Sequence, residues 1–303
     1  MQEFFSQTAL EQIKSNESPP EIVENFLIPE EVKKLLDFEI NASNRFVERK
    51  DGRKTGLGVN GEIGKSVKDW DPVIKEILLE KIEKKIGRFD VVADEYPPHF
   101  FRTVFPVSMH ADTGHDSNAI IGKQILIPLE VVPESSKAQT ILFNRKWYGP
   151  ASNFISKNPD IPNSVNHHVL PDANGKFITF DDVKKFYDVI KDKKNETVKI
   201  NEGIFEISEE FKEYVKSLIG NKRYNQMTNK HIINEESFDK IQYQKFLTHI
   251  DYYSLQSLKI EKIFEWKPTS ALIWDRTTLH ASNNYLVDGV KNKLGIAIFT
   301  VKK

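Results

Sequence analysis

The stretch FFRTVFPVSMHAD, residues 100–112, decides how the rest of the chain is interpreted. Its apolar and β-branched residues predict a strand over 100–109, and His110 and Asp112 follow directly after it. Residues i and i+2 of a strand point to the same face, so we expect the imidazole and the carboxylate to reach one common point. The pair is therefore a candidate metal site at the end of a strand.

A third candidate ligand, His280, lies far downstream, and the apolar residues 271–274 predict a strand that runs towards it. A His-x-Asp pair with a distal His is the ligand set that holds non-haem Fe(II) on one face and leaves the opposite face open. Lys293 follows thirteen residues after His280 and opens an apolar run. Its face of the predicted strand carries the small residues Gly295 and Ala297, which leave space for a bound anion such as a dicarboxylate.

Other residues compete for these roles, since most isolated His-x-Asp pairs are structural. The sequence holds a second copy, His249 with Asp251, but only 29 residues (280 − 251) separate it from His280, which is too little chain to build the walls of a pocket. This second copy remains a candidate for the border of a substrate cleft. His115 stays open as a replacement for His110, and Lys291 as a replacement for Lys293.

The composition excludes several classes of protein. The chain has 303 residues, no cysteine and a net charge of −1. Disulfides, thiolate metal sites and cysteine nucleophiles are therefore excluded, and no charge pattern indicates nucleic acid or a membrane surface. Neither a signal peptide nor a membrane-length apolar stretch is evident, so we expect a soluble, cytoplasmic protein.

The hydrophobic pattern predicts a mostly β domain with flanking helices, of the α+β class. Strand-like runs cluster in two regions, and helices are expected on either side of them. The expected strands are 22–27, 100–109, 124–132, 140–147, 258–266, 271–274 and 294–301, and the expected helices begin at Pro29 and after Asp71. The first 20 residues predict a short helix followed by a linker.

Residues 146–248 differ in composition, being rich in Asn, Lys, Asp and Pro. Two helices are expected there, one capped by Thr179 and one capped by Ser208 and stopped by Gly220. We therefore expect a single domain over 1–303 with a large, partly helical insertion over 146–248 that forms a lid or a substrate wall.

Together, His110, Asp112, His280 and Lys293 resemble the Fe(II)/2-oxoglutarate-dependent oxygenases. The resemblance covers roughly residues 95–145 and 250–302. It implies a double-stranded β-helix, also called a jelly roll, with N-terminal helices. It also implies iron on the two histidines and the aspartate, and the C5 carboxylate of 2-oxoglutarate on Lys293, as in prolyl-4-hydroxylase-like members.

The resemblance also implies a second polar partner for 2-oxoglutarate, for which Gln124 is the candidate. Three features depart from the family: the loop between His280 and Lys293 is long, Gly295 stands where a serine is usual, and the insertion has no counterpart. The activity implied is that of a dioxygenase that decarboxylates 2-oxoglutarate to succinate with O2 and hydroxylates a small molecule or a peptide. The oligomeric state stays open.

Two alternatives remain. A non-catalytic, cupin-like jelly-roll binding module would keep the fold without productive iron. A zinc hydrolase could use the same ligands, but no general-base motif accompanies them.

Overall fold

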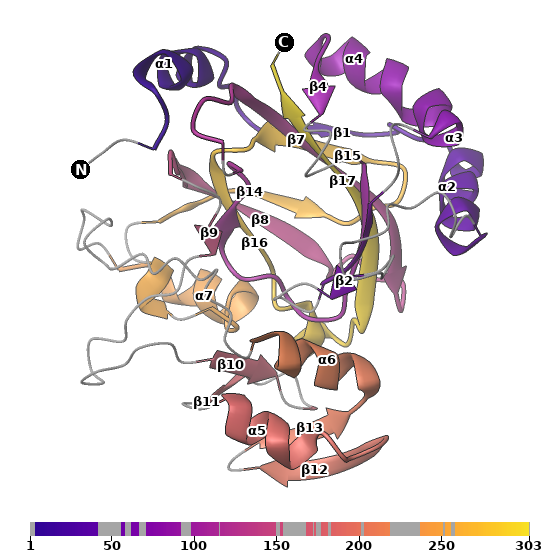
Figure 1. Cartoon of the computed structure of the whole chain (residues 1–303), viewed down its shortest axis with the longest axis vertical. Helices are drawn as coiled ribbons and strands as arrows, with labels where there is room; N and C mark the ends of the chain where they lie inside the picture. Colours follow the sequence, from indigo (N-terminus) through magenta and orange to yellow (C-terminus); the bar gives the residue numbers. More distant parts are fainter. Residues whose placement is uncertain are drawn as a thin grey trace.

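The computed structural model describes residues 4–41, 56–57, 62–66, 71–91, 98–114, 116–149, 152–153, 168–171, 173, 177–180, 183–200, 203–218, 237–250, 252–255 and 258–302. Over these residues the protein is built mostly of antiparallel β-sheets, with helices on the outside (Figure 1). Within the described part, no helix combines the length and the apolar character needed to cross a membrane.

The larger sheet contains eight strands, of which seven follow the order β1-β15-β7-β17-β5-β3-β2, while β4 pairs with β17. Its strands are β1 (Glu21–Val23), β2 (Gly56–Leu57), β3 (Glu62–Ser66), β4 (Asp90–Val91), β5 (His99–Thr103), β7 (Ile121–Val132), β15 (Ala271–Asp275) and β17 (Asn292–Val301). The long strands β7 and β17 pair over most of their length and form the centre of the sheet.

The smaller sheet has the order β14-β8-β16-β6-β9. Its strands are β6 (His110–Ala111), β8 (Gln139–Lys146), β9 (Ser152–Asn153), β14 (Ile260–Glu265) and β16 (Thr278–Ser282). The two sheets pack face to face, because Leu126 and Leu272 of the larger sheet share one buried cluster with Leu142 and Phe264 of the smaller. The candidate site lies between the sheets.

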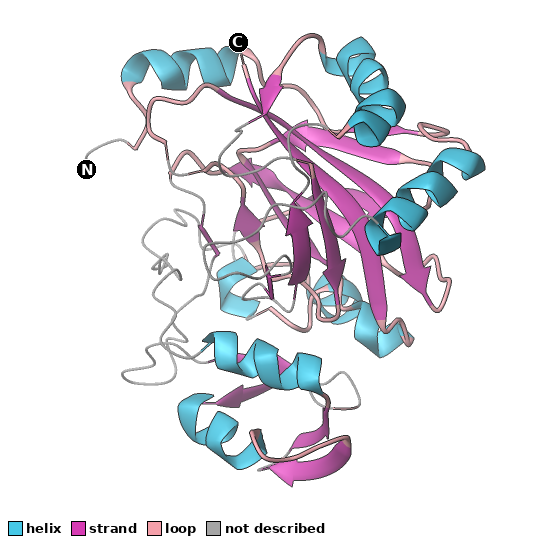
Figure 2. Ribbon diagram, turned by 45° about the vertical axis from the view of Figure 1, so that its right-hand side comes forward, coloured by secondary structure: helices cyan, strands magenta, loops and turns pink. Residues whose placement is uncertain are grey.

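Helices cover the outer face of the larger sheet (Figure 2). They are α2 (Pro29–Asn41), α3 (Pro72–Ile74), a π-helical turn (Lys75–Leu79) and α4 (Glu80–Ile86). The predicted start of the second helix is confirmed, since the Asp71 carboxylate accepts a hydrogen bond from the Val73 amide at 2.9 Å. Leu294, Ile296 and Ile298 of β17 point towards these helices, so the opposite parity of β17 faces the interior.

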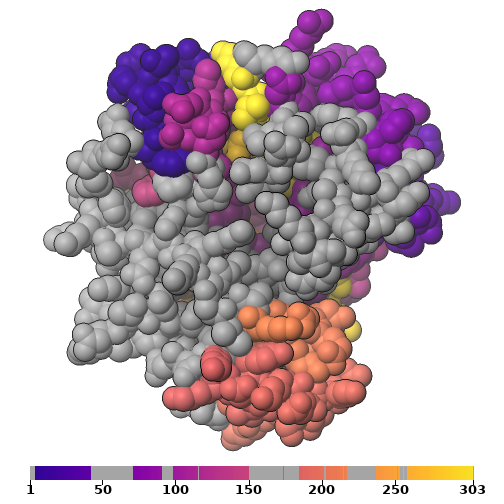
Figure 3. Space-filling view, viewed as in Figure 1, coloured from indigo at the N-terminus to yellow at the C-terminus, as the bar shows by residue number. Residues whose placement is uncertain are grey.

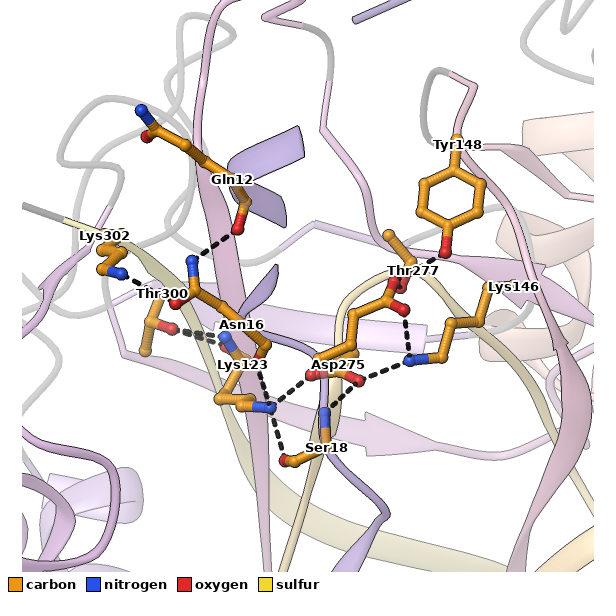
Figure 4. A network of polar contacts seen from close by, with 11 residues as sticks. Gln12, Asn16, Ser18, Lys123, Lys146, Tyr148, Asp275, Thr277, Thr300 and Lys302 are labelled. Carbon is orange, nitrogen blue, oxygen red and sulfur yellow. Dashed lines mark hydrogen bonds and ion pairs between the residues drawn. The ribbon is translucent and has the colours of Figure 1, made fainter. Parts of the chain in front are cut away.

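The N-terminal helix α1 (Gln7–Ser15) and the segment after it are held to the core by a polar network around Asp275 (Figure 4). The Asp275 carboxylate pairs with Lys123 and Lys146 and accepts a hydrogen bond from the Ser18 amide. Lys146 also pairs with Glu17 at 3.0 Å. The first segment of the chain is thus bonded to strands β7, β8 and β15.

A small lobe follows β8 in the sequence and has a core of its own. It comprises α5 (Val183–Ile190), β12 (Glu196–Ile200), β13 (Gly203–Ile207) and α6 (Glu209–Leu218). Phe186, Phe205 and Phe211 are buried in it, and Phe105 packs against them from the segment after β5. The lobe projects from the lower end of the molecule in Figure 3. The limits 146–248 and the lid role remain predictions.

Three further elements come from the same part of the sequence. The strands β10 (His168–Pro171) and β11 (Phe177–Phe180) form a separate pair. The helix α7 (Lys240–Phe246) packs against the outer face of the smaller sheet through Phe246. Neither α7 nor the β12–β13 hairpin was predicted from the sequence.

Three local predictions need correction. The expected strand 100–109 ends at Thr103, and after Pro106, which has no amide hydrogen to donate to a ladder, the chain crosses to the smaller sheet. The strand expected over 22–27 ends at Val23. Thr179 does not cap a helix, because it lies within β11 opposite Val169. The Ser208 cap is confirmed by its bond to the Phe211 amide, while Gly220 lies outside the described residues.

Candidate metal centre

His110, Asp112 and His280 come together between the two sheets. Each offers one ligand atom, and these three atoms lie within 4.8 Å of one another. Nε2 of His280 lies 3.2 Å and Nε2 of His110 lies 3.7 Å from Oδ2 of Asp112. Among the described residues this is the one group of three His, Cys or acidic side chains with such spacing.

Strand pairing brings the two histidines together. His280 on β16 is directly opposite His110 on β6, and the centroids of their rings lie 4.0 Å apart. Directly opposed residues of an antiparallel pair point to the same face, so both imidazoles turn into the space between the sheets. Asp112 follows His110 by two residues and joins them on that side.

Backbone carbonyls fix the orientation of both rings. Nδ1 of His110 lies 2.8 Å from the carbonyl oxygen of Ser108, and Nδ1 of His280 lies 3.0 Å from that of Thr278. A carbonyl can only accept, so Nδ1 donates in each ring, and Nε2 is the nitrogen that faces Asp112 and would be available to a metal. Such a bond is the usual outer contact of a metal-binding histidine.

The Asp112 carboxylate is kept ionised by its surroundings. Burial alone would raise its pKa, but His110, His280 and Arg276 together hold the pKa well below its usual range. An ionised carboxylate between two imidazole nitrogens is a donor set that fits a divalent metal ion.

Lys293 lies in the same interior, buried to 1% exposure on β17. Its ammonium sits 3.9 Å from the centre of the Trp266 ring and 5.2 Å from that of Tyr285. Its one hydrogen bond among the described residues is a long one, 3.4 Å, to the carbonyl oxygen of Gln139. Burial lowers the pKa of Lys293 well below its usual range.

No carboxylate within the described residues forms an ion pair with Lys293. A buried cation without an anion is costly, by several kcal/mol, so this position favours binding an anion from solution. Lys291, the alternative to Lys293, directly precedes β17 and is exposed to solvent.

Gly295 explains how Trp266 fits beneath the lysine. A Cβ at Gly295 would lie 3.1 Å from the Trp266 ring and 3.1 Å from the carbonyl oxygen of Ile127. The Trp266 indole is fixed from its other side by a 2.8 Å hydrogen bond to the Thr140 hydroxyl. Gly295 thus makes room for the aromatic ring of Trp266 beneath the ammonium.

Thr103 is a site residue that the sequence did not reveal. It lies directly opposite Lys293 in the β5–β17 pair and is fully buried. Its hydroxyl oxygen has no hydrogen-bond partner among the described residues. Only the register between β5 and β17 identifies it, and that register is not visible in the sequence.

Gln124 is buried, and its Oε1 atom also has no partner among the described residues. Gln124 lies on β7, and its cross-strand neighbours are Trp274 on β15 and Phe299 on β17, whereas Lys293 pairs with Val131 of β7. At roughly 3.4 Å per residue, the seven steps along β7 from 124 to 131 place Gln124 on the order of 20 Å from Val131, the residue opposite Lys293. Gln124 therefore lies too far along β7 to contact the same anionic group as Lys293.

Trp274 is the cross-strand neighbour of Gln124 and also contacts the candidate metal cluster. Its ring centroid lies 5.0 Å from that of His280, and its Nε1 atom has no partner among the described residues. Trp274, which is the cross-strand neighbour of Gln124, thus lies beside His280.

The competing His-x-Asp copy lies elsewhere. His249 is buried, with Nε2 3.3 Å from the carbonyl oxygen of Val107. Burial, reinforced by the charge of Lys293, lowers the pKa of His249 to about 3, despite the opposing effect of its hydrogen bond. The side chain therefore stays neutral at physiological pH. Asp251 and His115 lie outside the described residues.

Comparison with known proteins leaves the chain without an assigned family. Neither a protein-family model nor a curated protein matches it. Among solved structures, the crystal structure of HygX from Streptomyces hygroscopicus with nickel and 2-oxoglutarate bound aligns over 99% of this chain and 88% of its own. The two share 8% identity and a TM-score of 0.37, a likeness too slight to assign a fold or a ligand.

Proposed function

We propose that this protein is an Fe(II)- and 2-oxoglutarate-dependent dioxygenase that hydroxylates a small molecule or a peptide. One observation carries the proposal: the interior that holds the His110, Asp112 and His280 cluster also holds Lys293, a buried cation without an acidic partner among the described residues. A divalent metal ion would bind to the cluster, and the carboxylate of a bound dicarboxylate would pair with Lys293.

The order of the strands supports a double-stranded β-helix as the fold. In chain order, β5, β6, β7 and β8 alternate between the larger and smaller sheets, and β14, β15, β16 and β17 alternate again from the smaller sheet. The central strands then read β15-β7-β17-β5 in one sheet and β14-β8-β16-β6 in the other. Two such four-stranded, antiparallel sheets face to face are the layout of a jelly roll.

The donor set fits iron. Two imidazoles and one carboxylate make the 2-His-1-carboxylate triad of non-haem Fe(II) oxygenases. With 2-oxoglutarate and O2, the metal would supply oxidative decarboxylation to succinate and CO2 and the oxidation of an unactivated C–H bond. The chain's own contribution is to fix the ligands, exclude water and orient both substrates.

The buried polar atoms fit a dicarboxylate. The Lys293 ammonium and the Thr103 hydroxyl, which are cross-strand neighbours, would bind its distal carboxylate. The Trp266 ring would close the pocket beneath. Gln124 and Trp274, whose polar atoms lack partners among the described residues, would contact the molecule or an ordered water nearer the metal.

The test begins with metal and co-substrate binding. Fe(II) and 2-oxoglutarate added without oxygen to the purified protein should give a metal-to-ligand charge-transfer band. His110→Ala and Asp112→Ala should abolish that band and succinate formation, because each removes a ligand. His99→Ala, on β5 outside the cluster, is the control and should keep both.

Two results would contradict the proposal. Normal succinate production by Asp112→Ala would remove the metal assignment. A wild-type protein that binds Fe(II) and 2-oxoglutarate but never consumes the latter, with any of a panel of metabolites and peptides, would indicate the non-catalytic binding module instead.

A further inference from the structure

Arg276 is a buried arginine in the turn between β15 and β16, and it connects the loop that carries Asp112 to the end of β17. Its side chain is 1% exposed. Nε donates to the carbonyl oxygen of Asp112 at 2.7 Å, and one terminal nitrogen donates to that of Thr300 at 3.1 Å. The guanidinium also lies 5.6 Å from the centre of the Phe299 ring. The carboxylate-bearing loop is thus tied to the end of β17.

The loop that carries Asp112 begins where the strand ladder ends. β6 ends at Ala111, so Asp112 itself lies beyond the ladder. The hydroxyl of the next residue, Thr113, donates to the carbonyl oxygen of Gly149 at 2.7 Å. Gly114 has a φ of +80°, a conformation that favours glycine.

Gly114 also lies against the guanidinium. A Cβ at this position would be 3.3 Å from a terminal nitrogen of Arg276. The arginine therefore occupies the space under the loop, and its planar fork reaches two strand ends that no strand pairing connects.

We propose that Arg276 is a positioning residue for the proposed metal ligand Asp112. Its hydrogen bond holds the backbone of Asp112 so that the carboxylate lies beside His110 and His280. This inference rests on the proposed metal site. Its hydrogen bond goes to the backbone carbonyl of Asp112, and its charge also lowers the pKa of the Asp112 carboxylate, so Arg276 acts on the geometry of the site as a cation and not as a ligand. Residues of this kind around a metal change affinity by about 10–100-fold when they are replaced.

Arg276→Met and Arg276→Lys separate the proposed role from simple core packing. Methionine fills much of the space but donates no hydrogen bond. A lysine keeps the charge but lacks the fork, so it can hold the carbonyl of Asp112 or that of Thr300 with one point donor. We expect Co(II) affinity to fall about 10–100-fold in Arg276→Met and by an intermediate factor in Arg276→Lys.

Co(II) is the probe because its visible absorption reports the arrangement of its ligands. The spectrum of the saturated Arg276→Met variant should differ from that of the wild type, since Asp112 would approach the metal differently. A purely structural role would lower thermal stability and leave the spectrum of the saturated, folded protein unchanged.

The matched control is Lys212→Met in the small lobe. Lys212 is likewise a buried cation that donates to backbone carbonyls, those of Lys191 and Lys193, and it lies in a different core. Its replacement should lower stability without altering Co(II) affinity or the spectrum.

The outcomes are distinct. Wild-type Co(II) affinity and spectrum in both folded Arg276 variants would overturn the inference, while His110-dependent Co(II) binding by the wild type would leave the proposed function standing. A wild-type protein that does not bind Co(II) would instead contradict the proposed function. If Arg276→Met does not fold, Arg276→Lys decides: an unchanged spectrum and affinity would overturn the inference, and changed ones would support it.

Discussion

At the scale of single residues, Lys293 combines two demands that conflict in the free protein. It is buried between Trp266 and Tyr285, and that burial lowers its pKa. An anion bound beside it would favour the charged form and raise the pKa again. Binding of 2-oxoglutarate should therefore be accompanied by proton uptake.

The sign of the pH dependence follows from this shift. Below the lowered pKa of the free protein the ammonium is already charged, and affinity for 2-oxoglutarate is full. As the pH rises from that value towards the pKa of the complex, affinity should fall by up to about tenfold per pH unit, because each binding event must take a proton from solution.

Calorimetry in two buffers of different ionisation enthalpy measures the uptake directly. Lys293→Arg, whose guanidinium stays charged at all accessible pH values, is the comparison and should take up fewer protons than the wild type. Equal uptake by the two proteins would show that Lys293 is not the group that titrates.

Thr103 offers a second residue-scale prediction. Its hydroxyl is fully buried and has no partner among the described residues, so the isosteric change Thr103→Val should cost the free protein nothing and stabilise it by up to about 1–3 kcal/mol. The same change should weaken 2-oxoglutarate binding about tenfold, since one hydrogen bond to the carboxylate is lost. Thermal unfolding and ligand titration check the two halves, and a variant that is both less stable and equally tight-binding would contradict them.

The sequence predicted the charged residues of this site but not their uncharged partners. His110, Asp112, His280 and Lys293 could be found because each is polar in an apolar, strand-like context and because strand alternation relates i to i+2. Thr103 could not, since threonine is common in strands and only cross-strand register shows that it opposes Lys293. Gln124 was chosen by its place in the sequence, and the register puts it far along β7 from the residue opposite Lys293.

At the scale of the element, the side chains of β17 alternate between the hydrophobic core under the outer helices and the interior that holds the candidate site. Leu294, Ile296 and Ile298 pack against the outer helices, while Lys293 and Gly295 face the interior. Gly295→Ala should destabilise the protein by about 1–3 kcal/mol, because its methyl group would press on Trp266 and on the carbonyl of Ile127. It should also weaken 2-oxoglutarate binding by moving the ring under Lys293.

Gly289→Ala is the matched control for this change. Gly289 has a φ of +83°, and nothing lies within 4 Å of the point that an added methyl group would occupy. Its replacement therefore strains only the turn before β17, by about 1–2 kcal/mol. A loss of stability in Gly289→Ala with unchanged affinity, beside a loss of both in Gly295→Ala, would separate the two effects. Unaltered affinity in Gly295→Ala would mean that Trp266 does not shape the anion pocket.

Elements were predicted well where periodicity ran without interruption and less well where tertiary pairing decided. The helix after Asp71 was found from its cap and its apolar stripe. The strand over 100–109 was predicted too long because its apolar and β-branched residues continue to Met109, although Pro106 interrupts them and β5 ends at Thr103. The short β12–β13 hairpin is polar on one side, and its core partners lie in α5 and α6.

At the scale of the whole molecule, one carboxylate, that of Asp275, lies at the centre of the polar contacts between the first segment of the chain and the core. Asp275 has a side chain only 6% exposed and lies between Lys123 and Lys146, whose side chains are 18% and 29% exposed. Asp275→Asn should lower the free energy of unfolding by about 2–3 kcal/mol, less than a fully buried pair because water still reaches both lysines. It should also increase hydrogen exchange in α1.

Glu24→Gln provides the comparison at the surface. Its partner Lys267 is 59% exposed and Glu24 itself 57%, so the loss should stay below about 0.5 kcal/mol. Denaturant unfolding of both variants measures the difference. Similar small effects from the two changes would show that the Asp275 network adds little to the attachment of the N-terminal segment.

The direct opposition of His110 and His280 has a consequence for how the protein is made. The two residues are 170 positions apart (280 − 110), yet they are partners in one short antiparallel pair. During synthesis, a chain that has not yet emerged to β16 lacks one ligand, and a register slip of one residue would turn His280 to the outer face. Binding of the proposed metal would therefore require the finished fold, and its binding energy would add to the stability of that state alone.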